Sequence, residues 1–96
     1  MKKVYVSIPI TGQDYQDQRN HAFVVATNLA QKGCDVVTPF DIIQSPNTPY
    51  NEAMGKCIAT LLDCDAIYLC KNWQTSKGCS SELQVALVYG KEVITE

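Results

Sequence analysis

Short apolar runs alternate along the chain with segments in which apolar residues recur every three or four positions. Four runs rich in β-branched or aromatic residues predict buried strands at 3–8, 35–39, 66–69 and 91–95. The segments between them have the period of helices that bury one face. A chain that alternates strands and helices in this way predicts an α/β protein with a parallel sheet.

The first helix is predicted from Gln13 onward. Asp14 and Asp17 lie in its first turns, where the helix dipole favours negative charge. Lys32 and Gly33 supply a cation and a glycine, which is typical of a helix end. The face expected to point inward carries Tyr15, Arg19, Ala22, Phe23, Ala26, Leu29 and Ala30.

The second helix is predicted to start at Thr48 and Pro49, with threonine as the N-cap and proline in the first helical position. Residues 40–47, just before it, show no period, and we expect a loop that folds over a neighbouring part of the protein. A third helix is expected at 80–89, followed by Gly90. The inward stripe of the second helix comprises Tyr50, Met54, Cys57, Ile58, Leu61 and Leu62.

These elements predict a three-layer α/β sandwich, flavodoxin-like or Rossmann-like, with helices on both faces of a sheet of about four strands. Strand–helix–strand connections are right-handed and parallel, and the expected strand order is 2-1-3-4. The switch point then falls between the first and third strands, and ligands bind at the carboxyl ends of such strands. Residues 9–12 and 70–82 are therefore expected to converge on one cleft.

Length and composition narrow the possible partners. Ninety-six residues correspond to a single domain, spanning 1–96. Hydrophobic residues make up 46% of the chain, charged residues 19%, and the net charge is -2. This balance is typical of a globular protein and lacks the basic surface that binds nucleic-acid polymers or membranes. A small anionic ligand is compatible with it.

The remaining sequence signals predict a cytoplasmic protein without a metal or cofactor. Met1 to Ser7 read as a first strand instead of a signal peptide, and no apolar segment has the length of a membrane span. The five cysteines are odd in number and contain no Cys-x-x-Cys pair, and the single His21 is distant from them in the sequence. We therefore expect reduced thiols that pack as small apolar groups, and no zinc site.

Glu82 is the candidate for chemistry. In the first turn of the predicted third helix, its pKa is expected to be lowered, which keeps the carboxylate ionised. An ionised carboxylate in a cleft can attack the anomeric carbon of a sugar or stabilise an oxocarbenium-like charge. The structural alternative is that acidic residues are simply common in first helical turns.

Polar residues next to Glu82 predict a binding site for an anion or a sugar. Ser76, Lys77, Gly78, Ser80 and Ser81 supply hydroxyls, one cation and backbone amides ahead of the helix. Serines at a helix start are also ordinary N-caps, which is the structural alternative for this group.

The first loop and two aromatic residues complete the candidate binding set. Tyr5 either stacks on a base or fills the core, and Trp73, in a polar loop, favours a ligand or interface role. The loop lacks the glycine-rich patterns of dinucleotide and P-loop sites. It consists of Pro9, Ile10, Thr11 and Gly12.

Two segments, 4–12 and 64–68, and the Ser-x-Gly-x-x-x-Glu spacing of Ser76, Gly78 and Glu82 resemble a known family. It is a family of small uncharacterised proteins from phage and bacterial genomes, itself similar to nucleoside 2-deoxyribosyltransferases and nucleoside 5′-monophosphate N-glycosidases. The similarity covers nearly the whole chain. It implies that Glu82 is the nucleophile on the sugar, that Tyr5 and the first loop line the site, and that 76–81 faces the sugar or its 5′-phosphate.

Two positions depart from the pattern of that family. Relatives usually carry an aspartate eight residues before the position of Asp65, where this chain has Cys57; that aspartate positions the sugar and handles the proton of the leaving base. Relatives also usually have glycine at the position of Ile8, and a β-branched residue there is expected to narrow the pocket.

We therefore expect a nucleoside- or nucleotide-binding protein that resembles enzymes cleaving or exchanging the bond between base and (deoxy)ribose through a glutamate. One alternative is a non-catalytic binder that sequesters a nucleotide or an ADP-ribose-type signal, as a phage-encoded anti-defence protein would. A third reading is a role in protein assembly. A homodimer or larger homo-oligomer is expected, because so small a domain has little depth to enclose a nucleotide.

Overall fold

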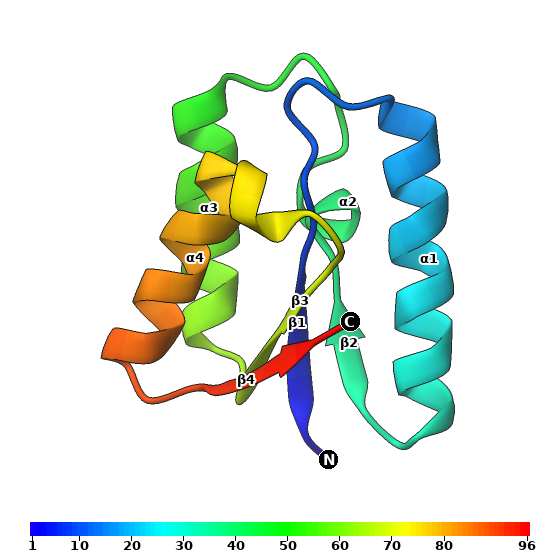
Figure 1. Cartoon of the computed structure of the whole chain (residues 1–96), viewed down its shortest axis with the longest axis vertical. Helices are drawn as coiled ribbons and strands as arrows, with labels where there is room; N and C mark the ends of the chain where they lie inside the picture. Colours follow the sequence, from blue (N-terminus) through cyan, green and yellow to red (C-terminus); the bar gives the residue numbers. More distant parts are fainter.

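In a computed structural model that describes residues 1–96, the chain folds into a four-stranded parallel sheet flanked by helices (Figure 1). The strands are β1 (Lys3–Ser7), β2 (Asp35–Val37), β3 (Ala66–Leu69) and β4 (Glu92–Thr95). The helical elements are α1 (Tyr15–Gln31), α2 (Pro39–Ile42), α3 (Tyr50–Leu62), the 3-10 turn η1 (Trp73–Thr75) and α4 (Lys77–Val88). The predicted α/β class is confirmed. None of the helices has the length and apolar character needed to cross a membrane.

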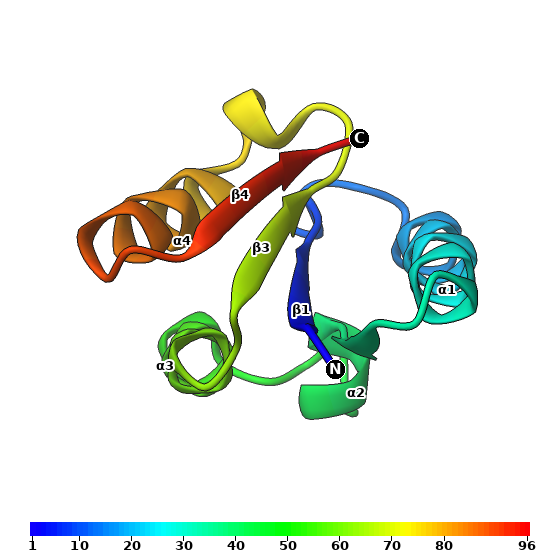
Figure 2. The ribbon, with the colours of Figure 1, turned by 90° about the horizontal axis from the view of Figure 1, so that it is seen from below.

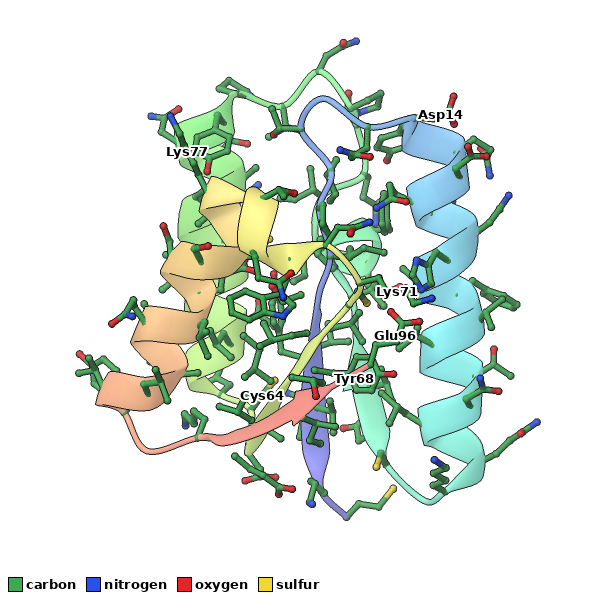
Figure 3. All side chains as sticks on the ribbon, viewed as in Figure 1. Asp14, Cys64, Tyr68, Lys71, Lys77 and Glu96 are labelled. Carbon is green, nitrogen blue, oxygen red and sulfur yellow. The ribbon has the colours of Figure 1, made fainter.

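The strand order is β2-β1-β3-β4, as predicted, and every neighbouring pair is parallel. Val4 in the central strand β1 lies opposite Val36 on one side and Ala66 on the other. Helix α1 covers one face of the sheet, and α3 and α4 cover the other (Figure 2). The helices α1 and α4 begin at the end of the molecule where Figure 3 labels Asp14 and Lys77.

Strand β1 supplies side chains to both halves of the core because successive residues of a strand point to opposite faces. Val4 and Val6 pack against α1 with the fully buried Ala66. Tyr5 points to the opposite face and packs among side chains of α3 and α4. Four of the five cysteines are buried, and all five are free.

Helix α1 begins at Tyr15, two residues after the predicted start at Gln13, and ends at Gln31, just before Lys32 and Gly33 as predicted. The Asp14 carboxylate accepts a hydrogen bond from the Asp17 amide at 2.9 Å, which makes Asp14 the N-cap. Gly33 follows the helix with φ of +90°, a left-handed conformation that favours glycine. Because α1 begins soon after β1 ends, only a short loop, which includes residues 9–12, crosses the edge of the sheet at the carboxyl end of β1.

The buried face of α1 is narrower than predicted. It consists of Ala22, Val25 and Leu29. Phe23, predicted to point inward, is 72% exposed, and Arg19 is exposed as well. Phe23 follows Ala22 directly, and one step along an α-helix turns a side chain by about 100° away from the buried face.

Several boundaries differ from the prediction: β1 ends at Ser7 instead of Ile8, β2 ends at Val37 instead of Pro39, and β4 begins at Glu92 instead of Lys91. Residues Thr38 and Asp41 form a capping box in which the Asp41 carboxylate accepts from the Thr38 amide at 2.9 Å. This capping box begins the short helix α2. The sequence had predicted that a strand continues to residue 39 and that a loop follows at 40–47. Pro49, not Thr48, is the N-cap of α3, and α4 begins at Lys77 instead of at residue 80.

The core between α3 and the sheet predicts a large effect for Leu61→Ala. Leu61 is fully buried beside Tyr5 and Ile67, and we expect the change to lower the free energy of unfolding by about 2 to 5 kcal/mol because it leaves a cavity. Urea unfolding measures this, with an unchanged m-value. The control Val24→Ala, at a position of α1 that is 54% exposed, is expected to cost only about 0.5 kcal/mol. Equal costs for both would contradict this assignment of the core.

Candidate functional site

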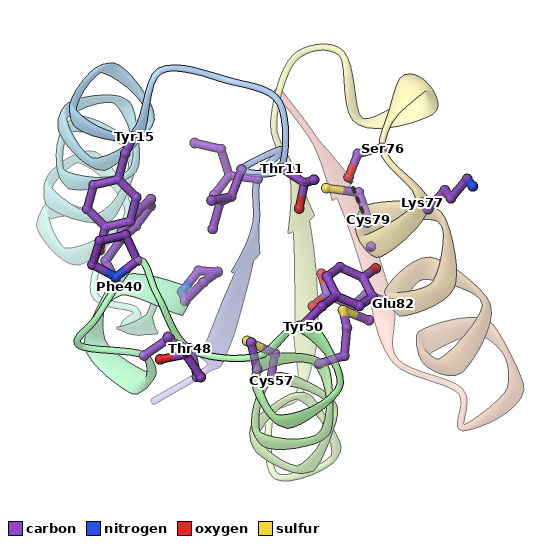
Figure 4. Close-up of a pocket in the computed structure, with 18 of the residues that line it drawn as sticks. Thr11, Tyr15, Phe40, Thr48, Tyr50, Cys57, Ser76, Lys77, Cys79 and Glu82 are labelled. Carbon is purple, nitrogen blue, oxygen red and sulfur yellow. Dashed lines mark hydrogen bonds between the residues drawn. The ribbon is translucent and has the colours of Figure 1, made fainter.

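A cavity of about 620 Å³ lies at the carboxyl end of β1. This volume lies within the usual range of small-molecule sites. The first loop contributes Ile10 and Thr11, and the start of α4 contributes Ser76 to Cys79 (Figure 4). The two loops that the sequence predicted to converge therefore meet in one cavity. Further walls come from α2, from the segment that follows it, and from α3.

Glu82 of α4 lines this cavity and is only 5% exposed. Both of its carboxylate oxygens accept hydrogen bonds from β1. The Tyr5 hydroxyl donates to Oε2 at 2.7 Å, and the Ser7 hydroxyl donates to Oε1 at 2.7 Å. Tyr5 and Ser7 are fully buried and point to the same face of β1 because they are two residues apart. The carboxylate is therefore held in a fixed position by the central strand.

Burial raises the pKa of Glu82 above its ordinary value, and the hydrogen bonds from Ser7 and Tyr5 offset part of the rise. The prediction of a lowered pKa is therefore wrong. It assumed that Glu82 lies in the first turn of its helix. Because α4 begins at Lys77, Glu82 lies in the second turn, beyond the unpaired amides that favour a charge.

The groups around Glu82 are neutral. Burial raises the pKa of Tyr5 well above its ordinary value, and the nearby Glu82 charge adds to the rise, so Tyr5 stays a donor. Burial also raises the pKa of Cys57 and of Cys79; interaction with Tyr5 offsets part of the rise at Cys57, and Ser7 and Ser76 do so at Cys79. The raised pKa values of Cys57 and Cys79 favour the protonated thiols over the thiolates.

The cavity is polar at one side and aromatic at the other. Lys77 is the only cationic residue among those lining it, and Ser76 next to it caps α4 by accepting from the Cys79 amide at 3.2 Å. Tyr15 and Phe40 lie on the opposite side (Figure 4), with ring centroids 5.3 Å apart in an edge-to-face contact. Such a cavity suits a ligand with an aromatic part and a hydroxylated or anionic part.

The structure brings together six of the residues that the sequence predicted for the site, and places six others elsewhere. Those lining the cavity are Ile10, Thr11, Ser76, Lys77, Gly78 and Glu82. Those outside its lining are Tyr5, Pro9, Gly12, Trp73, Ser80 and Ser81. Tyr5 lies behind Glu82 with its ring in the core, which leaves no ring face for stacking on a base. Trp73 packs against the core beside α4, and Pro9 lines a separate small cavity.

Several residues of the site were missed by reading the sequence. Ser7 was detectable, since it is a polar residue inside an apolar strand and two positions from Tyr5. Phe40 and Tyr50 were assigned to a loop and to a helix core, and both line the cavity. The Thr38-x-x-Asp41 spacing of the capping box was the available signal that this segment folds locally.

Ser7→Ala tests the role of the Ser7 hydroxyl. Its loss removes a hydrogen bond that lowers the pKa of Glu82, so we expect the Glu82 titration to move to higher pH. At neutral pH the variant is expected to be about 1 to 3 kcal/mol less stable, because one buried oxygen of an ionised carboxylate loses its donor. Carboxyl-carbon NMR of labelled glutamate measures the titration. Ser81→Ala, an exposed position on α4, serves as control, and an unchanged titration in Ser7→Ala would refute this role.

The sheet order and the helices on its two faces are those of the 2-deoxyribosyltransferase fold. By sequence, the chain belongs to the DUF4406 family, described as a domain of unknown function, which it matches over residues 2–95. A comparison with curated proteins finds no match. The family and the fold confirm the resemblance predicted from the sequence.

Two solved structures define the fold relationship. The 2-desoxiribosyltransferase from Leishmania mexicana matches with a TM-score of 0.76 over 99% of this chain, at 21% sequence identity. The 2-deoxyribosyltransferase from the psychrotolerant bacterium Bacillus psychrosaccharolyticus matches with a TM-score of 0.73 over 97% of the chain, at 17% identity. The chain spans 63% of the first protein and 70% of the second.

Proposed function

We propose that this protein binds a nucleoside or nucleotide and cleaves or exchanges the bond between its base and its (deoxy)ribose, with Glu82 as the nucleophile. One observation carries the proposal: the Glu82 carboxylate lies at the wall of a cavity of nucleotide size, with both oxygens fixed by buried hydroxyls of β1. The fold shared with 2-deoxyribosyltransferases is consistent with this chemistry.

The proposed reaction has two steps. A Glu82 oxygen bonds to the anomeric carbon while the bond to the base breaks, and the bonding electron pair leaves with the base, which takes up a proton from solvent. In the second step, water or a second base attacks the same carbon, loses a proton to solvent and releases the carboxylate. Tyr5 and Ser7 hold the carboxylate in place throughout, and each oxygen keeps a lone pair for the attack.

The surroundings of Glu82 also suggest how such a substrate lies. The aromatic side at Tyr15 and Phe40 accommodates the base. The hydroxyls and amides at the start of α4, together with Lys77, accommodate sugar hydroxyls or a phosphate. Glu82 and Cys57 lie between the aromatic side and the polar side of the cavity (Figure 4). In the proposed complex, the bond between base and sugar lies at this position.

A second candidate function is binding without turnover. Two features favour it: the thiol of Cys57 lies beside Tyr5 where relatives usually carry an aspartate, and Ile8 lines the cavity where relatives usually carry glycine. Loss of an acid–base group costs about two to four orders of magnitude in rate. Such a protein would hold a nucleotide or an ADP-ribose-type signal unchanged.

A panel of nucleosides and 5′-monophosphates, with chromatography of the released base, tests the enzymatic proposal. Turnover by the wild-type protein that exceeds that of Glu82→Gln is expected. Calorimetry with the same ligands and with ADP-ribose separates the two candidates: tight binding with intact ligand afterwards supports the binder. Absence of both turnover and binding across the panel would rule out both.

The same proposal includes a homo-oligomer. The end of α4 exposes three consecutive apolar residues, Leu87, Val88 and Tyr89, with exposed fractions of 54%, 75% and 64%. Apolar surface of this kind is typical of contacts between subunits. This contact would lie at the end of α4, whereas the cavity lies at its start, so it would join subunits away from the cavity.

A further inference from the structure

A second cluster of ligating side chains lies apart from the candidate site. His21 comes from α1, Cys70 directly follows β3, and Glu96 directly follows β4. Their ligating atoms, an imidazole nitrogen, a thiol sulfur and a carboxylate oxygen, all lie within 4.8 Å of one another. The three residues are far apart in the sequence, and the ends of two neighbouring strands bring them together against α1.

Each of the three is held by the backbone or by its neighbours. Cys70 is fully buried, and its amide donates to the Ser7 carbonyl at 3.0 Å. The Glu96 amide continues the sheet by donating to the Leu69 carbonyl at 3.0 Å. The Glu96 carboxylate contacts His21 Nε2 at 2.8 Å and accepts from the Lys71 amide at 2.9 Å. Figure 3 shows Glu96 and Lys71 beside each other, next to α1.

We propose that His21, Cys70 and Glu96 form a zinc site. Imidazole, thiolate and carboxylate are the three ligand types that zinc takes from proteins. A thiolate and a carboxylate together would neutralise the charge of Zn²⁺, with the thiol proton released to solvent on binding. From bond lengths of about 2.0 to 2.3 Å, tetrahedral ligand atoms lie roughly 3.3 to 3.8 Å apart. Small side-chain movements within the present cluster reach this arrangement.

The fourth position of a tetrahedral site has room beside this cluster. A cavity of about 190 Å³ is lined by His21, Lys71, Asn72, Gln13 and Gln18, together with Pro9. Three protein ligands and one open position are typical of zinc sites that keep a water or bind a solute. Lys71 and the amides of this cavity suit an anionic or water ligand.

The proposed ion would also act on the first loop. Pro9 lines the small cavity, whereas its neighbours Ile8 and Ile10 line the large one. Gln18 of α1 donates to the Pro9 carbonyl at 2.7 Å, so α1 already fixes this loop. A metal that ties α1 to the ends of β3 and β4 would stiffen the loop between the two cavities.

Calorimetric titration of the metal-free protein with zinc chloride tests the proposal. One zinc ion per chain and a higher melting temperature are expected. His21→Asn and Cys70→Ser are each expected to weaken binding by more than about tenfold. Cys34→Ser, which removes a half-buried cysteine outside the cluster, is the matched control and is expected to leave the affinity unchanged.

Cobalt substitution supplies a second measurement. Cobalt(II) in the site is expected to give the ultraviolet charge-transfer absorption of a thiolate ligand in the wild-type protein and to lose it in Cys70→Ser. Absence of stoichiometric zinc binding would overturn the proposal and leave an ion pair between His21 and Glu96. Unchanged affinity in both ligand variants would overturn it as well. Because His21 lies on the surface side of the cluster, His21→Asn remains informative if Cys70→Ser fails to fold.

Discussion

Glu82→Gln is expected to lower the rate of base release by at least about 10³-fold, which corresponds to about 4 kcal/mol of transition-state stabilisation. The amide has the shape of the carboxylate and retains hydrogen-bonding capacity toward Tyr5 and Ser7. It lacks the charge and the nucleophilic oxygen that the proposed first step needs. Single-turnover release of base from a nucleotide that the wild-type protein cleaves measures the effect.

Stability provides the control for this variant. The pKa of Glu82 is raised in the folded protein, so the folded state binds its proton more tightly than the unfolded chain does. Ionised Glu82 therefore destabilises the fold, and stability falls as the pH rises from the unfolded pKa through the raised folded pKa. Glu82→Gln is expected to remove this fall and to be no less stable at neutral pH. Glu92→Gln, at an exposed carboxylate of β4, is expected to change neither the rate of base release nor the fall in stability that Glu82 causes as the pH rises.

Cys57→Asp is expected to raise the rate of base release by about 10²-fold. Cys57 is buried at the cavity wall beside Tyr5 and near the Glu82 charge. A carboxyl group there would share a proton with Glu82, because two close carboxylates resist double ionisation, and the protonated partner can donate to the leaving base. The comparison of pre-steady-state rates for the variant and the wild-type protein, over a range of mildly acidic pH, measures the gain.

Cys57→Asn is the matched control for the aspartate variant, since it has the same shape and cannot ionise. If the gain depends on proton transfer, the asparagine variant is expected to stay at the wild-type rate. An equal gain in both variants would show that shape alone limits turnover. No gain in Cys57→Asp, with ligand binding retained, would favour the non-catalytic binder.

The four strands and the helices α1 and α3 were predictable because their sequence signals are local. The runs at 3–8 and 66–69 combine apolar residues with clear ends, and the alternation with helices determines a parallel sheet. The order of the strands was expected from the flavodoxin-like arrangement that such alternating chains often adopt, and the sheet has this order. Helix α2 was missed because its four residues are too few to show a period.

The site was less predictable because its properties depend on contacts between distant residues. Glu82 and Ser7 are 75 positions apart in the chain, and only the folded sheet shows that one donates to the other. Burial, which decides the direction of the pKa shift at Glu82, depends on the packing of α4 against β1. The closeness of His21 to Cys70 and Glu96 depends in the same way on the pairing of β3 with β4.

The alternation of β1 restricts how this family can vary. Val4 and Val6 face α1, whereas Tyr5 and Ser7 hold Glu82 on the opposite face. Deletion of a single residue within β1 would turn the following side chains to the opposite face of the sheet. Residues that pack against α1 would then face Glu82, and the residues that hold Glu82 would face α1. Homologous chains are therefore expected to exchange apolar residues at the positions of Val4 and Val6 but not to lengthen or shorten this strand. Insertions and deletions are expected only in the loops on either side.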